Sequence, residues 1–258
     1  MSAVEVHHVV SGPEDAPVVL LSNSLGSTHA MWDPQVAALA ERFRVVRYDT
    51  RGHGLSPVPP GPYSIDDLVD DAVALLDRLG VQRAHVVGLS LGGMTGMRLA
   101  AREPDRVDRL VVLCTGARLA PVSGWTDRAA TVRAHGTAAV ADAVVQRWFT
   151  PSFLEAHPDE RARYEAMVAD TPAEGYAGCC EVIAGMDLRP DLPTIAAPTL
   201  AIAGADDPAT PPERLEEIAS AVQDGRLLVV PDAAHLANAE QPAVVTRAIL
   251  DHLTQENA

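Results

Sequence analysis

Short runs of valine and leucine alternate along the chain with longer segments of helical periodicity, and this alternation restricts the fold more than any other feature. The apolar runs cover residues 17–22, 43–49, 84–89, 109–115, 198–204 and 225–231. Their apolar residues are nearly continuous, as in strands that are buried on both faces of a sheet. Because strands that alternate with helices form right-handed βαβ crossovers, the sequence predicts a mostly parallel, open sheet flanked by helices.

The segments with helical spacing that belong to this pattern cover residues 32–43, 64–80, 211–222 and 241–253. The second of them begins at Ser64, a residue type that caps helix N-termini, and ends at Gly80. Residues 4–12 have the composition of one additional strand at the start of the chain. The sequence therefore predicts an α/β fold with one further strand outside the regular alternation.

The alternation is interrupted once, between residue 120 and about residue 190, where helical stretches follow one another without a convincing strand. We therefore expect an α/β core that is formed by residues 1–118 and 191–258 and is interrupted by a helical cap at 119–190. A chain of 258 residues is long enough to bury the core of one such domain and to carry the insertion.

The chain is strongly acidic, with a formal net charge of −15, and its 20 basic residues are all arginine. Such a surface repels nucleic acid and anionic membranes, so we expect neither as a partner. No apolar run approaches the ~18 residues of a membrane span, and no secretory signal is visible. The three cysteines, of which Cys179 and Cys180 are adjacent and fit helix packing, indicate reduced thiols in the cytoplasm. Neither a metal nor a cofactor is expected, because no His/Cys/Asp cluster has ligand spacing.

The pentapeptide GLSLG, residues 88–92, stands where a predicted strand meets a helix. Phosphate-binding turns and nucleophile elbows both use glycine-rich turns at such a junction. A dinucleotide-binding turn has the pattern G-x-G-x-x-G, but Ser90 occupies the position of its second glycine. G-x-S-x-G is the pattern of the nucleophile elbow, whose sharp turn needs glycine two residues on either side of the serine. The sequence therefore favours Ser90 as a catalytic nucleophile over a structural turn.

A nucleophilic serine needs a histidine base and a carboxylate that orients it, and at a nucleophile elbow the chain order is serine, acid, histidine. Of the nine histidines, His235 lies in a loop just after a late strand, which predicts it as the general base and not a solvated loop residue. The acid should follow the preceding strand, where Asp206 and Asp207 are adjacent. We favour Asp207, which directly precedes Pro208, and Asp206 is the alternative.

The oxyanion of an acyl-transfer reaction needs two N–H donors. We predict that Leu91, directly after the nucleophile, supplies one donor, and that Leu25, in the loop after the first buried strand, supplies the other. The alternative for Leu25 is that this loop is only a turn. Asp49, Arg51 and Gly52 also follow a strand end, and we interpret them as a structural turn.

Six stretches between residues 21 and 212 make the pattern more specific: LSNSLGSTHAMWDPQ, VVRYDTRGHGLS, GLSLGGMTGMRLA, RWFTPSF, EGYAGCCEVIAGMDLR and AGADDPATPP. The triad pattern resembles the α/β-hydrolase superfamily, and these stretches resemble 3-oxoadipate enol-lactonases, including stretches of the cap, which varies with substrate. The resemblance implies hydrolysis of 3-oxoadipate enol-lactone to 3-oxoadipate in the bacterial β-ketoadipate pathway. It also implies an acyl-enzyme on Ser90.

The substrate that this resemblance implies carries a carboxylate, which an acidic protein must attract locally. Arginine suits this task because its planar fork can bind both carboxylate oxygens. Among the arginines of the predicted cap, Arg133 has small and apolar neighbours and Arg147 adjoins Trp148. We predict that one of these two arginines binds the substrate carboxylate and that Trp148 forms part of the apolar wall.

Two alternatives to the lactonase stay open at this point. An esterase or a perhydrolase-like enzyme of the same fold would use the same triad. A ligand-binding protein that has lost catalysis would keep the fold, although the complete set of Ser90, Asp207 and His235 argues against it.

Overall fold

The structure, a computed structural model, describes residues 2–255 of the chain. Within these residues the strands form one seven-stranded sheet in the order β1-β3-β2-β4-β5-β6-β7. β1 is antiparallel to β3, and all other neighbours in the sheet are parallel, which confirms the predicted fold class. The strands are β1 (His8–Ser11), β2 (Val18–Ser22), β3 (Arg44–Tyr48), β4 (Ala84–Leu89), β5 (Val107–Leu113), β6 (Thr199–Gly204) and β7 (Gly225–Val230).

Burial explains the continuously apolar sequences of the inner strands but not that of β7. The run at 225–231 was expected to be buried on both faces, but Leu227 and Val229 of this strand are exposed. Every residue of the inner strands β2, β4 and β6 is buried, so both faces of these strands require apolar side chains. β1 and β7 form the two edges of the sheet. The strand expected over residues 4–12 is shorter than predicted, because β1 has one neighbour only and pairs with β3 over His8–Ser11.

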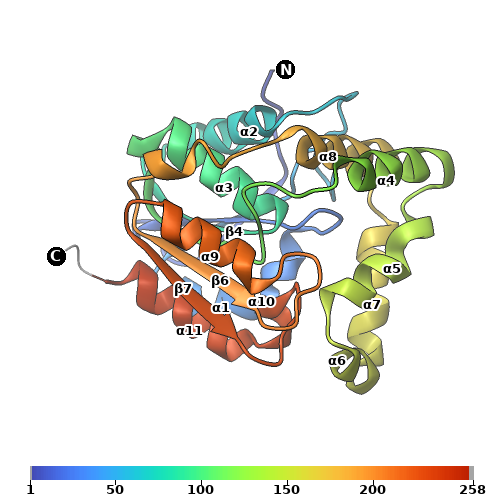
Figure 1. Cartoon of the computed structure of the whole chain (residues 1–258). Coiled ribbons are helices and arrows are strands. Elements are labelled where there is room, and N and C mark those ends of the chain that lie inside the picture. The colour runs from blue at the N-terminus through green and yellow to red at the C-terminus, as the bar shows by residue number, and fades with distance from the viewer. Residues whose placement is uncertain (1, 256–258) are drawn as a thin grey trace.

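Helices cover both faces of the sheet, as Figure 1 shows, and within the described residues none is long and apolar enough to cross a membrane. α1 and α11 pack together on one face, and α2 and α3 pack together on the other. The predicted N-cap of α2 is present, since the Ser64 hydroxyl accepts the N–H of Asp67. The core helices are α1 (Asp33–Ala40), α2 (Ile65–Arg78), α3 (Leu91–Arg102), α9 (Pro212–Ala221), α10 (Ala237–Glu240) and α11 (Pro242–Leu253), with 3-10 turns at His29–Trp32, Pro104–Arg106 and Leu192–Thr194.

The segment between β5 and β6 is helical, and its helices gather at one end of the sheet (Figure 1). α4 packs against α8, and α5 packs against α7. Cys179 and Cys180 are buried, free thiols in α8, as their helical packing predicted. The helices of the segment are α4 (Val122–His135), α5 (Ala138–Trp148), α6 (Pro151–Ala156), α7 (Pro158–Ala169) and α8 (Ala173–Gly185). That residues 119–190 form a separate domain stays a prediction.

Candidate active site

Ser90 lies in the turn between β4 and α3, in a strained backbone conformation. Its φ is +56° and its ψ is −114°, a region that residues other than glycine rarely adopt. A Cβ atom on Gly88 would lie 2.1 Å from the carbonyl oxygen of Gly92, and one on Gly92 would lie 2.2 Å from that of Ser22. Only glycine fits at either position, so the turn pattern in the sequence corresponds to a sharp turn in the structure.

His235 and Asp207 form a buried pair at the ends of neighbouring strands. The distance between His235 Nδ1 and Asp207 Oδ2 is 2.8 Å. The side chains are 6% and 0% exposed, respectively. Because the Asp207 carboxylate can only accept, Nδ1 carries the proton and Nε2 keeps its lone pair. Asp206, the alternative acid, is exposed and does not contact the histidine through its side chain in the described structure.

Three further donors converge on Asp207. Its oxygens accept the N–H of Ala209 at 2.8 Å, the N–H of Thr210 at 3.1 Å and the hydroxyl of Thr210 at 2.6 Å. Burial alone would raise the pKa of this carboxyl, but the charge of His235 and these hydrogen bonds lower it to about 2. Asp207 therefore stays ionised and can stabilise an imidazolium on His235.

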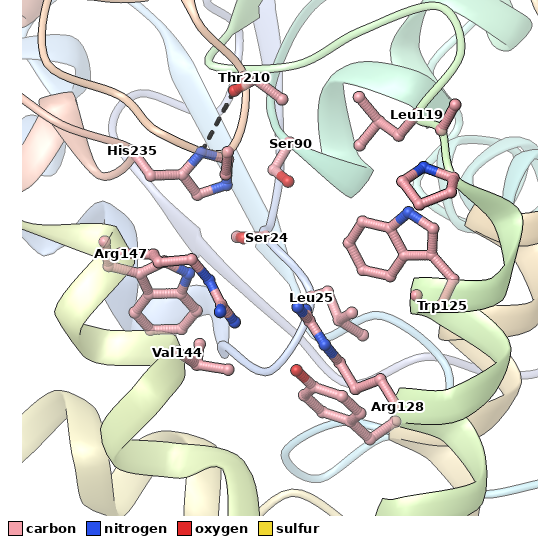
Figure 2. Close-up of a pocket in the computed structure, with 16 residues that line it drawn as sticks. Ser24, Leu25, Ser90, Leu119, Trp125, Arg128, Val144, Arg147, Thr210 and His235 are labelled. Atoms are coloured by element: carbon pink, nitrogen blue, oxygen red, sulfur yellow. Dashed lines mark hydrogen bonds between the residues drawn. The ribbon is translucent and has the colours of Figure 1, made fainter.

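Ser90 and His235 face one cavity of about 250 Å³, which lies between the loops at the ends of the sheet strands and the helices α4, α5 and α8, called the cap helices below. Figure 2 shows the Ser90 hydroxyl and the His235 ring on the same side of this cavity, with Ser24 and Leu25 below them. The core supplies the reacting groups from loops at the carboxyl ends of strands. The cap helices supply the remaining wall, with Trp125 and Arg128 from α4, Val144, Arg147 and Trp148 from α5, and Tyr176 from α8.

The loop after β2 and the first turn of α3 lie against each other beside Ser90. The N–H of Gly92 donates to the carbonyl oxygen of Asn23 at 2.9 Å, which fixes the loop to the turn. Leu91 is the first residue of α3, and Leu25 lines the cavity. In the described part of the chain, neither Leu25 nor Leu91 donates its N–H to another group. Both N–H groups are therefore available to an oxyanion.

Two arginines of the cavity wall lack a carboxylate partner. Within residues 2–255, neither Arg128 nor Arg147 forms an ion pair with an acid. Figure 2 shows both guanidinium groups extending into the cavity, and the guanidinium of Arg128 lies 4.7 Å from the centre of the Trp125 ring. Burial and the charge of Arg128 lower the pKa of Arg147. The cavity thus has positive charge available to an anion, in a protein whose net charge is −15.

Arg133 lies elsewhere, in the contact between α4 and α8. It forms ion pairs with Glu174 at 2.8 Å and with Glu181 at 2.5 Å, and it does not line the cavity. It lies five positions after Arg128, which corresponds to about 140° around a helix axis. The structure therefore does not bring Arg133 to the cavity, whereas Arg147 and Trp148 line it.

The turn at Asp49 is buried and structural, as its position predicted. The Asp49 carboxylate accepts the N–H groups of His29 at 2.8 Å and Leu55 at 3.1 Å. His7, His29 and Asp49 also bring possible metal-ligand atoms within 4.8 Å of one another. Since Asp49 Oδ1 already lies 2.9 Å from His29 Nδ1, this group is a hydrogen-bonded cluster, and we assign no metal to it.

Comparison with known proteins agrees with this geometry. Residues 17–242 match the alpha/beta hydrolase fold family. The chain belongs to this family. It is 39% identical over 246 residues to 3-oxoadipate enol-lactonase 2 of Acinetobacter baylyi, which covers 95% of this chain and 92% of that protein. It is 40% identical over 233 residues to 3-oxoadipate enol-lactonase 1 of the same species, and this match covers 90% of this chain and 87% of that protein.

The solved structure of the enol-lactonase from Burkholderia xenovorans LB400 superposes on this α/β hydrolase with a TM-score of 0.95. The two chains are 44% identical, and the match covers 97% of this chain and 96% of the other. The resemblance that the motifs indicated is thereby confirmed, and the chain is an enzyme of the hydrolase class.

Several residues that line this cavity were not predicted, and two of them bear on its chemistry. Arg128 is one, and the only local signal for it is Trp125, which lies three residues earlier on the same helix face. Thr210 is the second, since it donates to Asp207 and its hydroxyl oxygen lies 3.3 Å from His235 Nδ1. In the sequence, the only indication of this role is that Thr210 stands three residues after the predicted acid, Asp207.

Proposed function

We propose that this α/β hydrolase hydrolyses 3-oxoadipate enol-lactone to 3-oxoadipate in the β-ketoadipate pathway of bacterial aromatic catabolism. The observation that carries the proposal is the buried Asp207–His235 pair. His235 shares with Ser90 a cavity that is also lined by Arg128 and Arg147, two arginines with no ion pair among residues 2–255. The names of the two curated relatives and of the solved neighbour support the choice of substrate.

The first half of the proposed reaction forms an acyl-enzyme. Ser90 Oγ attacks the lactone carbonyl carbon while His235 Nε2 takes the hydroxyl proton. Asp207 stabilises the imidazolium that results, and the N–H groups of Leu25 and Leu91 donate to the oxyanion. As the carbonyl is restored, the ring C–O bond breaks and the enol oxygen leaves with the proton from His235. The enol then becomes the ketone.

The second half releases the product. A water molecule gives a proton to His235 and attacks the ester carbonyl of the acyl-enzyme, and Ser90 leaves with that proton. Because the leaving group of a lactone remains attached to the acyl chain, the cavity must hold the whole molecule through both steps. The cap helices that close the cavity on one side serve this purpose.

The carboxylate of the substrate is held, in this proposal, by the arginines of the cap. Arg133 and Arg147 were the two alternatives predicted for this role. We keep Arg147 and add Arg128, because these two arginines line the cavity and Arg133 does not. Both are half-buried, so an anion between them is partly shielded from water. Trp148 and Val144 provide the apolar wall against which the carbon chain of the substrate packs.

A comparison of substrates tests the proposal. Rates on the enol-lactone, on uncharged aryl esters and in peracid formation are measured side by side, and the active serine is titrated with an acylating phosphonate. We expect stoichiometric labelling of Ser90 and the highest kcat/KM for the enol-lactone. Labelling with higher kcat/KM on aryl esters would identify an esterase, and absence of labelling would identify a binding protein.

A further inference from the structure

We propose that His53 is a positioning residue of this enzyme, which orients the oxyanion loop, residues 23–27, so that the N–H of Leu25 faces the cavity. The inference rests on the proposed catalytic function of that N–H. His53 is 0% exposed and comes from the turn after β3, far from the loop in sequence. Its Nε2 accepts the N–H of Gly26 at 2.9 Å.

The hydrogen bonds of the oxyanion loop single out one donor. The N–H of Ser24 donates to the sulfur of Met31 at 3.3 Å, and the N–H of Gly26 donates to His53. Between these two, the N–H of Leu25 has no acceptor in the described structure. Since Leu25 lines the cavity beside Ser90, the unpaired donor is the one that catalysis would use.

Both peptide planes on either side of Leu25 are fixed, one by the loop itself and one by His53. The plane before Leu25 is held through the carbonyl oxygen of Ser24, which accepts the Ser27 hydroxyl at 2.8 Å. The plane after Leu25 ends in the N–H of Gly26, which His53 holds. The Leu25 N–H belongs to the first of these planes, so His53 acts on it through the backbone of Leu25. Loss of the His53 contact would release the Gly26 end of the loop, and a shift of that end would move the first plane, and with it the Leu25 N–H, away from the cavity.

The partners of His53 determine which ring nitrogen carries the proton. Nδ1 lies 3.2 Å from the carbonyl oxygen of Arg51, which can only accept, so Nδ1 carries the hydrogen. Nε2 faces an N–H, which can only donate, so Nε2 presents its lone pair. Burial lowers the pKa of His53 to about 4, although the Arg51 carbonyl and the charge of Asp49 oppose the shift. A neutral ring of this tautomer fits both partners at once.

The turn that carries His53 is anchored in the core. The Arg51 side chain is 0% exposed and donates to both oxygens of Asp71, at 2.6 and 2.7 Å. The N–H of Gly52 donates to the carbonyl oxygen of Pro57 at 2.8 Å. His53 thus connects a rigid, buried turn to a catalytic loop, and this connection explains why the turn contains a histidine.

Two amide substitutions of His53 test the inference because they differ by one methylene group. In His53→Gln the amide oxygen can stand near the position of Nε2 and accept the N–H of Gly26, whereas in His53→Asn it reaches only the position of Nδ1. One oxyanion donor contributes ~10²–10³ in kcat, and a misdirected donor should cost part of that. We expect kcat to fall ~10- to 100-fold in His53→Asn, to fall several-fold less in His53→Gln, and KM to change little in both.

A second readout separates orientation of the donor from general damage. Affinity for a trifluoromethyl ketone, which forms an oxyanion on Ser90, should fall in parallel with kcat, and affinity for the dicarboxylate product should stay at the parent value. His252→Asn is the matched control, since His252 is buried and bonded to the carbonyl oxygen of Pro198 but does not line the cavity. It should keep the parent kcat even if it lowers the melting temperature.

Equal kcat in His53→Gln and His53→Asn, or a parallel loss of product affinity, would overturn the inference. Every assay is repeated with an uncharged aryl ester, because the oxyanion hole serves both substrates. If the parent enzyme cleaves the aryl ester but not the enol-lactone, the proposed substrate is wrong, and the comparison of the His53 variants on the aryl ester still decides the role of His53.

Discussion

Replacement of the cavity arginines by methionine tests how the enzyme recognises an anionic substrate. Methionine keeps much of the length and apolar contact of arginine but removes the charge. Because Arg128 and Arg147 form no ion pair with an acid in the described structure, neither replacement breaks an ion pair there, although Arg128→Met also removes the contact with the Trp125 ring. Arg133→Met is the matched control, since this arginine lies on the same helix as Arg128 but pairs with Glu174 and Glu181 outside the cavity.

The size of the effect follows from the burial of the two arginines. A desolvated charge pair across a binding site is worth ~2–5 kcal/mol when one partner is removed. Both arginines are only half-buried, so we take the lower end, about 2 kcal/mol, which corresponds to about 30-fold in affinity. Arg133 forms a partly exposed pair, which contributes ~0–1 kcal/mol to folding and nothing to the cavity.

The assay compares kcat/KM for the enol-lactone with kcat/KM for an uncharged aryl ester in each variant. We expect Arg128→Met and Arg147→Met to lose about 30-fold on the lactone, mainly through KM, and less than about 3-fold on the aryl ester. Arg133→Met should match the parent on both substrates. Unchanged lactone kinetics in both cavity variants, or an equal loss on the two substrates, would refute electrostatic recognition by these arginines.

Three further predictions concern the triad and the turn that carries Ser90. Because Asp207 is the buried partner of His235, Asp207→Asn should lower kcat by ~10⁴, whereas Asp206→Asn should keep most of the activity. If steady-state kinetics showed the larger loss in Asp206→Asn, the assignment of Asp207 as the catalytic acid would be wrong. Because the pKa of Asp207 falls from 3.8 unfolded to about 2 folded, its contribution to stability is present above pH ~4 and lost as the pH falls to ~2. The melting temperature of Asp207→Asn should therefore depend less on pH in that window than that of the parent, and equal slopes would contradict this. Gly92→Ala should prevent folding or lower the melting temperature strongly, since its Cβ would lie 2.2 Å from a backbone oxygen. A variant that folds and has the parent melting temperature by circular dichroism would disprove the close approach.

The parts of the fold that the sequence predicted best are those where burial alone determines the residue types. β2, β4 and β6 are buried throughout, so their apolar runs define them closely. The first strand was predicted too long because an edge strand has one neighbour, and the extent of its pairing depends on that neighbour. The local sequence of residues 4–12 does not contain this information.

The candidate triad could be placed from motifs, because each member follows a strand in a fixed chain order. The motifs did not show which cap arginines line the cavity, because the side of a helix that faces a cavity depends on the neighbours with which the helix packs. Arg133 faces α8 and two glutamates, and Arg128 faces the cavity, although both belong to α4. The contact of His53 with Gly26 joins two loops that are distant in sequence, so no spacing rule could have found it.

Detection of the covalent intermediate tests the central claim most directly. The enzyme is mixed with 3-oxoadipate enol-lactone, quenched in acid within one turnover and digested, and the peptide that contains Ser90 is analysed by mass spectrometry. We predict an ester-linked acyl group on Ser90 in the parent, and no adduct and a ~10⁴-fold or greater loss of kcat in Ser90→Ala. Hydrolysis of the lactone by Ser90→Ala at near the parent rate, or an adduct on another residue, would contradict the account.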